Sequence, residues 1–172
     1  MAKTPQQIEI FVPGRICLFG EHSDWAAGYR KENPRIQKGY TIISQTNQGL
    51  YARAKPHPSQ LILHCSLDGG KRLAPISIPM APAALEQVAA EGGFFSYAAG
   101  VALHICKEQP VQGLEIDNYQ TNLPIKKGLS SSAACCVLVA RAFNQLYKLG
   151  LTVEEEMDYA YRGERSTGSQ CG

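Results

Sequence analysis

Residues 123–134 read LPIKKGLSSSAA and run directly into a helical pattern that Gly150 ends. Gly128 permits a tight backbone path, three serine hydroxyls follow, and the helix then begins with small residues that allow close approach. The free N–H groups and positive dipole end of a helix favour phosphate, and Lys126 and Lys127 add positive charge. The stretch therefore predicts an anion cradle. It is not a Walker A loop, because no Gly-Lys-Ser/Thr stands at the required spacing.

A simpler interpretation is that Ser130 to Ser132 only cap the helix, with Ala133 to Cys136 packed against a neighbouring element. A single serine at this position would support the cap-only interpretation. Three consecutive serines preceded by two lysines exceed what a cap requires, so phosphate binding is the favoured hypothesis.

The rest of the chain predicts one α+β unit of 172 residues without repeats or a linker. Apolar residues at helical spacing predict a helix over Phe94–Lys107 and another over Leu129–Leu149, and Thr152 with Glu155 forms a capping box for a last helix. Alternating or apolar runs predict the strands Ile8–Val12, Ile16–Phe19, Tyr40–Ile43, Gly49–Ala54, Leu61–Cys65 and Leu114–Tyr119.

Composition narrows the function classes. The chain is 44% hydrophobic and 19% charged, with a net charge of +2 and no dense Lys/Arg run, which argues against a nucleic-acid partner. No apolar stretch reaches the roughly 20 residues that cross a bilayer, and the N-terminal residues carry no apolar leader, so we expect a cytoplasmic protein without a membrane partner. The six cysteines form no C-x-x-C pair and the four histidines no zinc spacing, so the cysteines are expected to be reduced core residues.

A second cluster lies near the N-terminus, where residues 13–25 read PGRICLFGEHSDW. A short strand delivers Glu21, His22 and Asp24 to a turn, and two acids with an imidazole suit the hydroxyls of a polyol. The alternative is a plain turn with an Asx contact from Asp24 and a partly buried His22. The polar, mostly basic segment Tyr29–Lys38 that follows is either a lid or a solvated loop.

Together these segments resemble the GHMP small-molecule kinases, and most of all the galactokinases. Residues 14–25 are similar to the family's G-R-V-N-L-I-G-E-H-T-D-Y signature, and residues 126–133 to its G-x-G-L-S-S-S-A loop. Residues 163–172 look like the start of the segment that leads to C-G-x-M-D-Q. The resemblance implies that residues 1–172 form the family's N-terminal domain: a two-layer mixed sheet with helices on one face, like domain 2 of ribosomal protein S5.

It also implies an ATP-dependent kinase that transfers the γ-phosphoryl group to a sugar hydroxyl with the help of Mg²⁺. Arg15 would act catalytically beside the reacting hydroxyl, and Glu21, His22 and Asp24 would contact the sugar. Ser132 and Glu164 would bind Mg²⁺, although a helical glutamate is otherwise a solvated partner of Arg162 or Arg165. The residues that would hold the ATP phosphates are Lys126, Lys127, Gly128, Leu129, Ser130, Ser131 and Ser132.

The family's catalytic base, the Asp of C-G-x-M-D-Q, would lie beyond Gly172, and its C-terminal domain is missing from this sequence. We therefore expect the chain alone to be inactive and to self-associate. Lys126 stands where the family loop has its first Gly. Two alternatives remain: a kinase-derived sensor that binds sugar and ATP without turnover, and a mevalonate-type kinase. The acids Glu21 and Asp24 disfavour the second, because they would repel a carboxylate substrate.

Overall fold

A computed structural model describes residues 7–20, 29–37, 39–123 and 129–169. Five strands and four helices account for most of them. In chain order they are β1 (Ile8–Phe19), β2 (Ile42–His57), β3 (Gln60–Cys65), β4 (Ile76–Pro79), α1 (Pro82–Glu91), α2 (Ser96–Glu108), β5 (Gly113–Thr121), α3 (Ser131–Tyr147) and α4 (Val153–Arg165).

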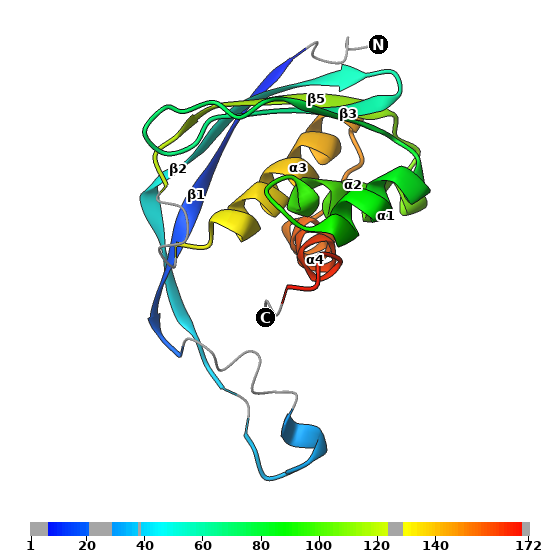
Figure 1. Cartoon of the computed structure of the whole chain (residues 1–172). Coiled ribbons are helices and arrows are strands. Elements are labelled where there is room, and N and C mark those ends of the chain that lie inside the picture. The colour runs from blue at the N-terminus through cyan, green and yellow to red at the C-terminus, as the bar shows by residue number, and fades with distance from the viewer. Residues whose placement is uncertain (1–6, 21–28, 38, 124–128, 170–172) are drawn as a thin grey trace.

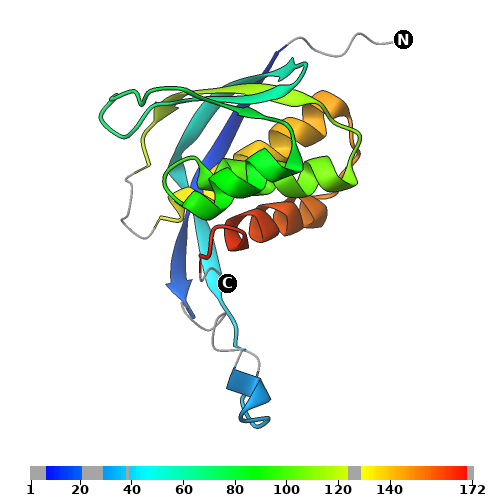
Figure 2. The same ribbon diagram turned by 45° about the vertical axis from the view of Figure 1, so that its right-hand side comes forward.

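The strands form one mixed sheet in the order β1-β2-β5-β3-β4. β3 and β5 are parallel, with Leu63 opposite Ile116, and the other neighbours are antiparallel. All four helices lie on the same face of this sheet (Figures 1 and 2). The predicted α+β fold, a mixed sheet covered by helices on one face, is confirmed.

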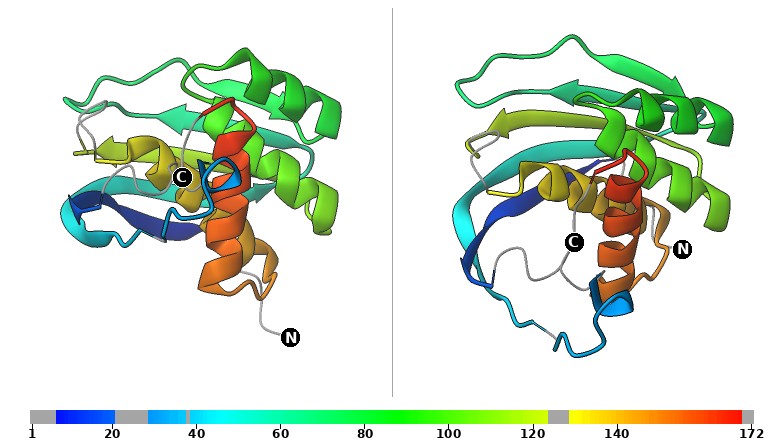
Figure 3. Two further views of the ribbon diagram at one scale, coloured as in Figure 1. Left: turned by 90° about the horizontal axis from the view of Figure 1, so that it is seen from below. Right: turned by 60° about the horizontal axis from the view of Figure 1, so that its bottom comes forward.

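The core lies between the sheet and the helices. Its largest fully buried side chains include Phe143 of α3, Leu61 of β3, Leu114 of β5 and Ile105 of α2. α4 packs against α2 and α3 on their side away from the strands (Figures 1 and 3). Among the described residues, no helix is long and apolar enough to cross a membrane.

The close approach of α4 to α2 depends on two glycines. A Cβ added to Gly163 would lie 2.6 Å from the backbone nitrogen of Val101, and one added to Gly100 would lie 2.3 Å from the carbonyl oxygen of Gly163. Neither helix could carry a larger side chain at this crossing without moving. The crossing fixes the position of the next residue on α4, Glu164.

Two pairs of predicted strands are single strands in the structure. β1 runs through Pro13 and Gly14 with a register shift between Pro13 and Arg15, and β2 runs through the polar residues 44–48. Proline is tolerated there because β1 is an edge strand, where a missing N–H breaks no ladder on the open side. The two strands extend away from the helices as a two-stranded arm, defined here as residues 16–19 and 42–44, which Figure 1 shows at the lower left. Residues 29–37 lie beyond this arm and are largely exposed.

The sequence analysis did not predict β4 and α1. β4 is only four residues long, and α1 buries just Leu85 and Ala89, so neither gives a strong apolar pattern. The available signal was Pro82, because proline is favoured in the first turn of a helix.

Candidate functional site

The N-terminus of α3 is the centre of the candidate site. α3 begins at Ser131, and Ser130 before it has a left-handed backbone with φ 56° and ψ 45°. A non-glycine residue in this region is strained, and such strain gathers at functional sites. No side chain caps this helix end, so the cap-only interpretation of the three serines is wrong. The first-turn N–H groups have no acceptor within the helix and present a positive end to the cavity described below.

Arg15 of β1 reaches this helix end from the sheet. Its Nε and Nη2 atoms donate hydrogen bonds to Ser130 Oγ at 3.1 and 2.8 Å, and its backbone N–H donates to Leu129 O at 3.3 Å. The guanidinium therefore adds a full positive charge where the helix already favours an anion. The structure thus brings together two predicted site residues that are 115 positions apart in the sequence.

Ser132 and Glu164 also meet here. Ser132 Oγ donates to Glu164 Oε1 at 2.7 Å, and Glu164 is only 8% exposed. The alternative of a solvated partner of Arg162 or Arg165 is wrong: Arg162 pairs with Glu108 and Asp158 instead, while Arg165 donates to Ser169 O. Glu164 faces α3 because it shares the buried side of α4 with Tyr159, Ala160 and Gly163.

A hydroxyl and a carboxylate oxygen are hard ligands that suit Mg²⁺. The described residues contain no group of three His, Cys, Asp or Glu side chains that could hold a metal by themselves. This donor set fits Mg²⁺ as proteins usually bind it, through one or two side chains with the remaining positions taken by water and substrate phosphates.

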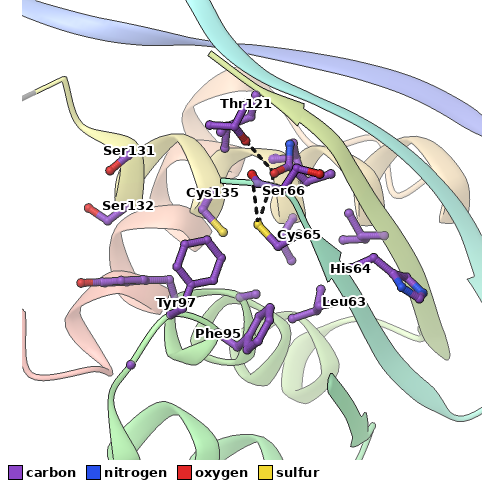
Figure 4. A pocket seen from close by; sticks show the side chains of 18 of the residues that line it. Leu63, His64, Cys65, Ser66, Phe95, Tyr97, Thr121, Ser131, Ser132 and Cys135 are labelled. Atoms are coloured by element: carbon purple, nitrogen blue, oxygen red, sulfur yellow. Dashed lines mark hydrogen bonds between the residues drawn. The ribbon is translucent and has the colours of Figure 1, made fainter. Parts of the chain in front are cut away.

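A cavity of about 740 Å³ opens beside the start of α3. Its walls come from β3, β5, α2, α3 and the connection before α2. Figure 4 shows Ser131 and Ser132 on one side of it, His64 on the other, and the rings of Phe95 and Tyr97 below. The volume falls in the range of small-molecule sites, and the lining is mainly apolar.

The thiols of Cys65 and Cys135 lie in the middle of this cavity (Figure 4). Burial raises the pKa of the Cys135 thiol to about 12, with smaller contributions from Cys65 and Glu164. Burial also raises the pKa of Cys65 to about 11. Both thiols therefore stay neutral at physiological pH, and the middle of the cavity carries no thiolate. Among the described cysteines, Cys65 and Cys136 are buried, whereas Cys17, Cys106 and Cys135 are partly exposed.

Several predicted site residues lie outside the described part of the chain. These are Glu21, His22 and Asp24 of the sugar cluster, and Lys126, Lys127 and Gly128 of the phosphate loop. Leu129 is described, and it packs against the core. The structure thus brings together the predicted residues Arg15, Leu129, Ser130, Ser132 and Glu164 around the start of α3, while Ser131 lines the cavity.

The sequence analysis missed the cavity beside the serines. Phe94 and Tyr97 fall within the predicted helix Phe94–Lys107, and Cys65 is among the cysteines expected to be reduced core residues. Asn118, which also lines the cavity, falls within the predicted strand Leu114–Tyr119. A polar residue at a buried position of a strand was the one signal that could have singled it out.

Comparison with known proteins supports the predicted resemblance. The model of the GHMP kinases N terminal domain matches residues 96–172. The chain is 27% identical to the galactokinase of Pyrococcus furiosus over 96% of its own length and 42% of that protein. It is 26% identical to the galactokinase of Haemophilus influenzae, covering 99% of the chain and 40% of that protein. The chain thus spans about two fifths of the length of the curated relatives it matches.

Solved structures agree on the fold. The galactokinase of Lactococcus lactis, complexed with galactose, superposes with a TM-score of 0.74 at 24% identity, covering 98% of this chain and 40% of that one. The mevalonate kinase of Methanococcus jannaschii gives a TM-score of 0.69 at 19% identity, covering 94% of this chain and 47% of that one. The family model of the GHMP kinases N terminal domain thus matches residues 96–172, and these solved kinases share the fold of nearly the whole chain.

Proposed function

We propose that the protein is an ATP-dependent kinase that phosphorylates a sugar hydroxyl, as galactokinases do. The observation that carries this proposal is the Ser132–Glu164 pair at the start of α3, which sets a hydroxyl and a buried carboxylate beside a positive helix end and a nucleotide-sized cavity. Phosphoryl transfer mainly requires that donor and acceptor be positioned and that charge be neutralised. These groups supply parts for both tasks.

The triphosphate of ATP would lie against the first turn of α3. There the backbone N–H groups and the Ser130–Ser132 hydroxyls would hold its oxygens, with Lys126 and Lys127 assigned to the same task by their place in the loop. The base would enter the cavity between the helices and β3. Because ATP is the proposed donor, we place the activity in the cytoplasm.

Ser132 and Glu164 would hold Mg²⁺. The ion, when bound, neutralises phosphate charge during transfer. Glu164 suits this role because burial shields its carboxylate from water that would compete with it for the ion. Ser132 orients the carboxylate through the 2.7 Å hydrogen bond. Arg15 supplies a fixed positive charge on the sheet side of the same helix end. It would stabilise negative charge on the transferred group or the attacking oxygen.

The sugar is assigned to Glu21, His22 and Asp24 by their motif alone. The curated relatives are galactokinases, which favours a hexose acceptor. Mevalonate kinases share the fold at 19% and 22% identity, and that likeness supports the architecture without favouring their substrate. We therefore propose galactose or a related sugar as the acceptor.

The test is Mg²⁺-dependent binding of a non-hydrolysable ATP analogue to the chain, measured by titration calorimetry, followed by titration with galactose and with mevalonate. We expect the analogue to bind only with Mg²⁺, and galactose to bind the resulting complex. Ser132→Ala and Glu164→Gln should each weaken Mg²⁺-dependent binding about 10- to 100-fold.

Ser77→Ala is the matched control, because its hydroxyl bonds Gln60 on the exposed β3–β4 edge. It should bind the analogue as the unchanged chain does. Equal affinity with and without Mg²⁺, or normal binding by both site variants, would refute the kinase assignment. Binding of mevalonate in place of galactose would refute the sugar assignment alone.

A further inference from the structure

We infer that the cavity holds the nucleobase by its faces rather than by the polar groups of its edge, so that it accepts guanine nucleotides about as well as adenine nucleotides. The inference rests on the proposed function and concerns the base specificity of that same site. It follows from how the polar atoms lining the cavity are already used.

Asn118 is the most capable polar side chain in the cavity, and its hydrogen-bonding capacity is fully used. Its Nδ2 donates to Tyr51 O and to Gln120 O, both at 3.0 Å. Its Oδ1 accepts from Thr121 Oγ1 at 2.8 Å and from Cys65 Sγ at 3.3 Å. An amide side chain has two donors and two acceptor lone pairs. Asn118 therefore has no free donor or acceptor for a base. The Thr121 hydroxyl and the Cys65 thiol already donate to Asn118 Oδ1.

Ser66 is committed in the same way, and His64 lies near a carboxylate. Ser66 Oγ donates to Tyr119 O at 3.1 Å and accepts from Arg72 Nη1 at 3.1 Å. The His64 ring lies at the opposite side from the serines, with Nε2 3.5 Å from Glu115 Oε1. A base edge would have to displace the two Ser66 hydrogen bonds before this hydroxyl could contact it.

Several backbone groups of the wall are also occupied. β3 and β5 pair in register along the cavity, and the N–H of Ser66 continues the ladder by donating to Asn118 O at 2.9 Å. The carbonyl of Cys65 accepts from Leu73 N at 2.9 Å. In the connection before α2, the carbonyl of Gly93 accepts from Ser96 Oγ at 2.8 Å.

The surfaces that remain are flat or apolar. Phe94 and Phe95 present two rings at 86° to each other with centroids 5.3 Å apart, and Tyr97 adds a third on the same wall. The thiols of Cys65 and Cys135 are neutral, as described above. Every base has a π-face, so stacking on aromatic rings tolerates a change of base.

Adenine and guanine differ at their edge, where an amino donor in one is replaced by a carbonyl acceptor in the other. A site that hydrogen-bonds such a group rejects the analogue by about 10⁴- to 10⁵-fold, because its own polar atoms would be left unpaired. Where Asn118, Thr121 and Ser66 line the cavity, their polar atoms are already paired and lose nothing when the edge changes. We expect the dissociation constants for ATP and GTP to agree within about tenfold.

The experiment measures binding of MgATP, MgGTP and magnesium tripolyphosphate to the chain by equilibrium dialysis. Similar affinities for the two nucleotides, both at least tenfold tighter than tripolyphosphate, are the expected result. A hundredfold preference for ATP would overturn the inference while leaving the proposed function intact. Tripolyphosphate binding as tightly as ATP would show that the cavity does not hold the base. Failure of all three to bind would overturn the proposed function together with the inference.

Phe94→Ala provides a second readout, because Phe94 is 40% exposed and its loss should not prevent folding. It should weaken ATP and GTP binding equally, by roughly tenfold, and leave tripolyphosphate unchanged. Phe11→Ala is the matched control: Phe11 is 43% exposed, lies on β1 against Tyr51 and is not part of the cavity lining. Weakening of ATP alone by Phe94→Ala would contradict face-only recognition.

Discussion

Single residues on α4 show how the fold tolerates a buried carboxylate, and which of its features can be identified from the sequence. Glu156, Ala160 and Glu164 are spaced by four, so they share one helix face, and all three are buried. Each acid has its own partners: Glu156 accepts from Arg141 and Asn144, and Glu164 accepts from Ser132. A spacing of four places these residues on one helix face, but only the packed helices reveal which partner each acid contacts.

The two cavity thiols give a prediction for stability against pH. Because burial raises the pKa of Cys65 to about 11 and of Cys135 to about 12, the folded chain keeps protons that the unfolded chain loses above about pH 9. The contribution of the neutral thiols to the free energy of unfolding is complete below pH 9. It falls by about 1 kcal/mol per pH unit for each thiol as the pH rises, up to about pH 11 for Cys65 and about pH 12 for Cys135. Urea unfolding at several pH values measures it.

Cys135→Ala and Cys135→Ser should both reduce this pH slope, although their stabilities at neutral pH will differ from each other. The comparison separates titration of the thiol from its packing. If both variants kept the pH slope of the unchanged chain, the raised pKa of Cys135 would be contradicted.

At the scale of elements, the helix that carries Glu164 is placed by its contact with α2. Gly163→Ala would put a methyl group 2.4 Å from Val101 Cγ2 and 2.6 Å from the Val101 backbone nitrogen, so α4 would have to shift. We expect a loss of about 1–3 kcal/mol of stability and weaker Mg²⁺-dependent nucleotide binding, because Glu164 would move away from Ser132. Urea unfolding and calorimetry give the two readouts.

Met157→Ala is the control on the same helix, since Met157 is 60% exposed. It should change stability by less than about 0.5 kcal/mol and leave nucleotide binding intact. If Gly163→Ala lowered stability and left Mg²⁺-dependent binding unchanged, the crossing would be a packing feature without a role in placing the carboxylate.

The N-cap of α4 was predicted from sequence and is confirmed. Thr152 Oγ1 accepts from Glu155 N at 3.2 Å, and Glu155 Oε2 accepts from Thr152 N at 2.7 Å. Thr152→Ala should cost about 1 kcal/mol in urea unfolding. Val153→Ala, at a neighbouring position that is 60% exposed, should cost little. Equal losses in both variants would show that the cap contributes nothing measurable.

Elements with strong local signals were the ones that the sequence could predict. The Thr152 capping box and the apolar pattern up to Gly150 are local features of the sequence, so α4 and α3 followed from them. Continuity of β1 through Pro13 was not predictable locally, because it depends on β1 being an edge strand. The cavity could not be predicted from the sequence either, because β3, β5, α2 and α3 come together only in the folded chain.

At the scale of the whole molecule, the β1–β2 arm exposes apolar side chains away from the helices. Leu18 is 54% exposed and Phe19 72%, while Ile42 and Ile43 on the facing strand are each 56% exposed. Apolar residues on an edge strand with open backbone groups favour association with another chain. We propose that the purified chain self-associates through this arm.

Sedimentation velocity over a range of protein concentrations tests the arm directly. The unchanged chain should show a mass that rises with concentration above 18.7 kDa, and ammonium sulfate should strengthen the association because apolar contacts drive it. The double variant Leu18→Gln/Ile43→Gln should shift toward the monomer. Val153→Gln/Met157→Gln removes two apolar side chains of similar exposure from α4 and should leave association unchanged. Equal shifts in both variants, or a monomer at every concentration, would show that the arm is not the contact surface.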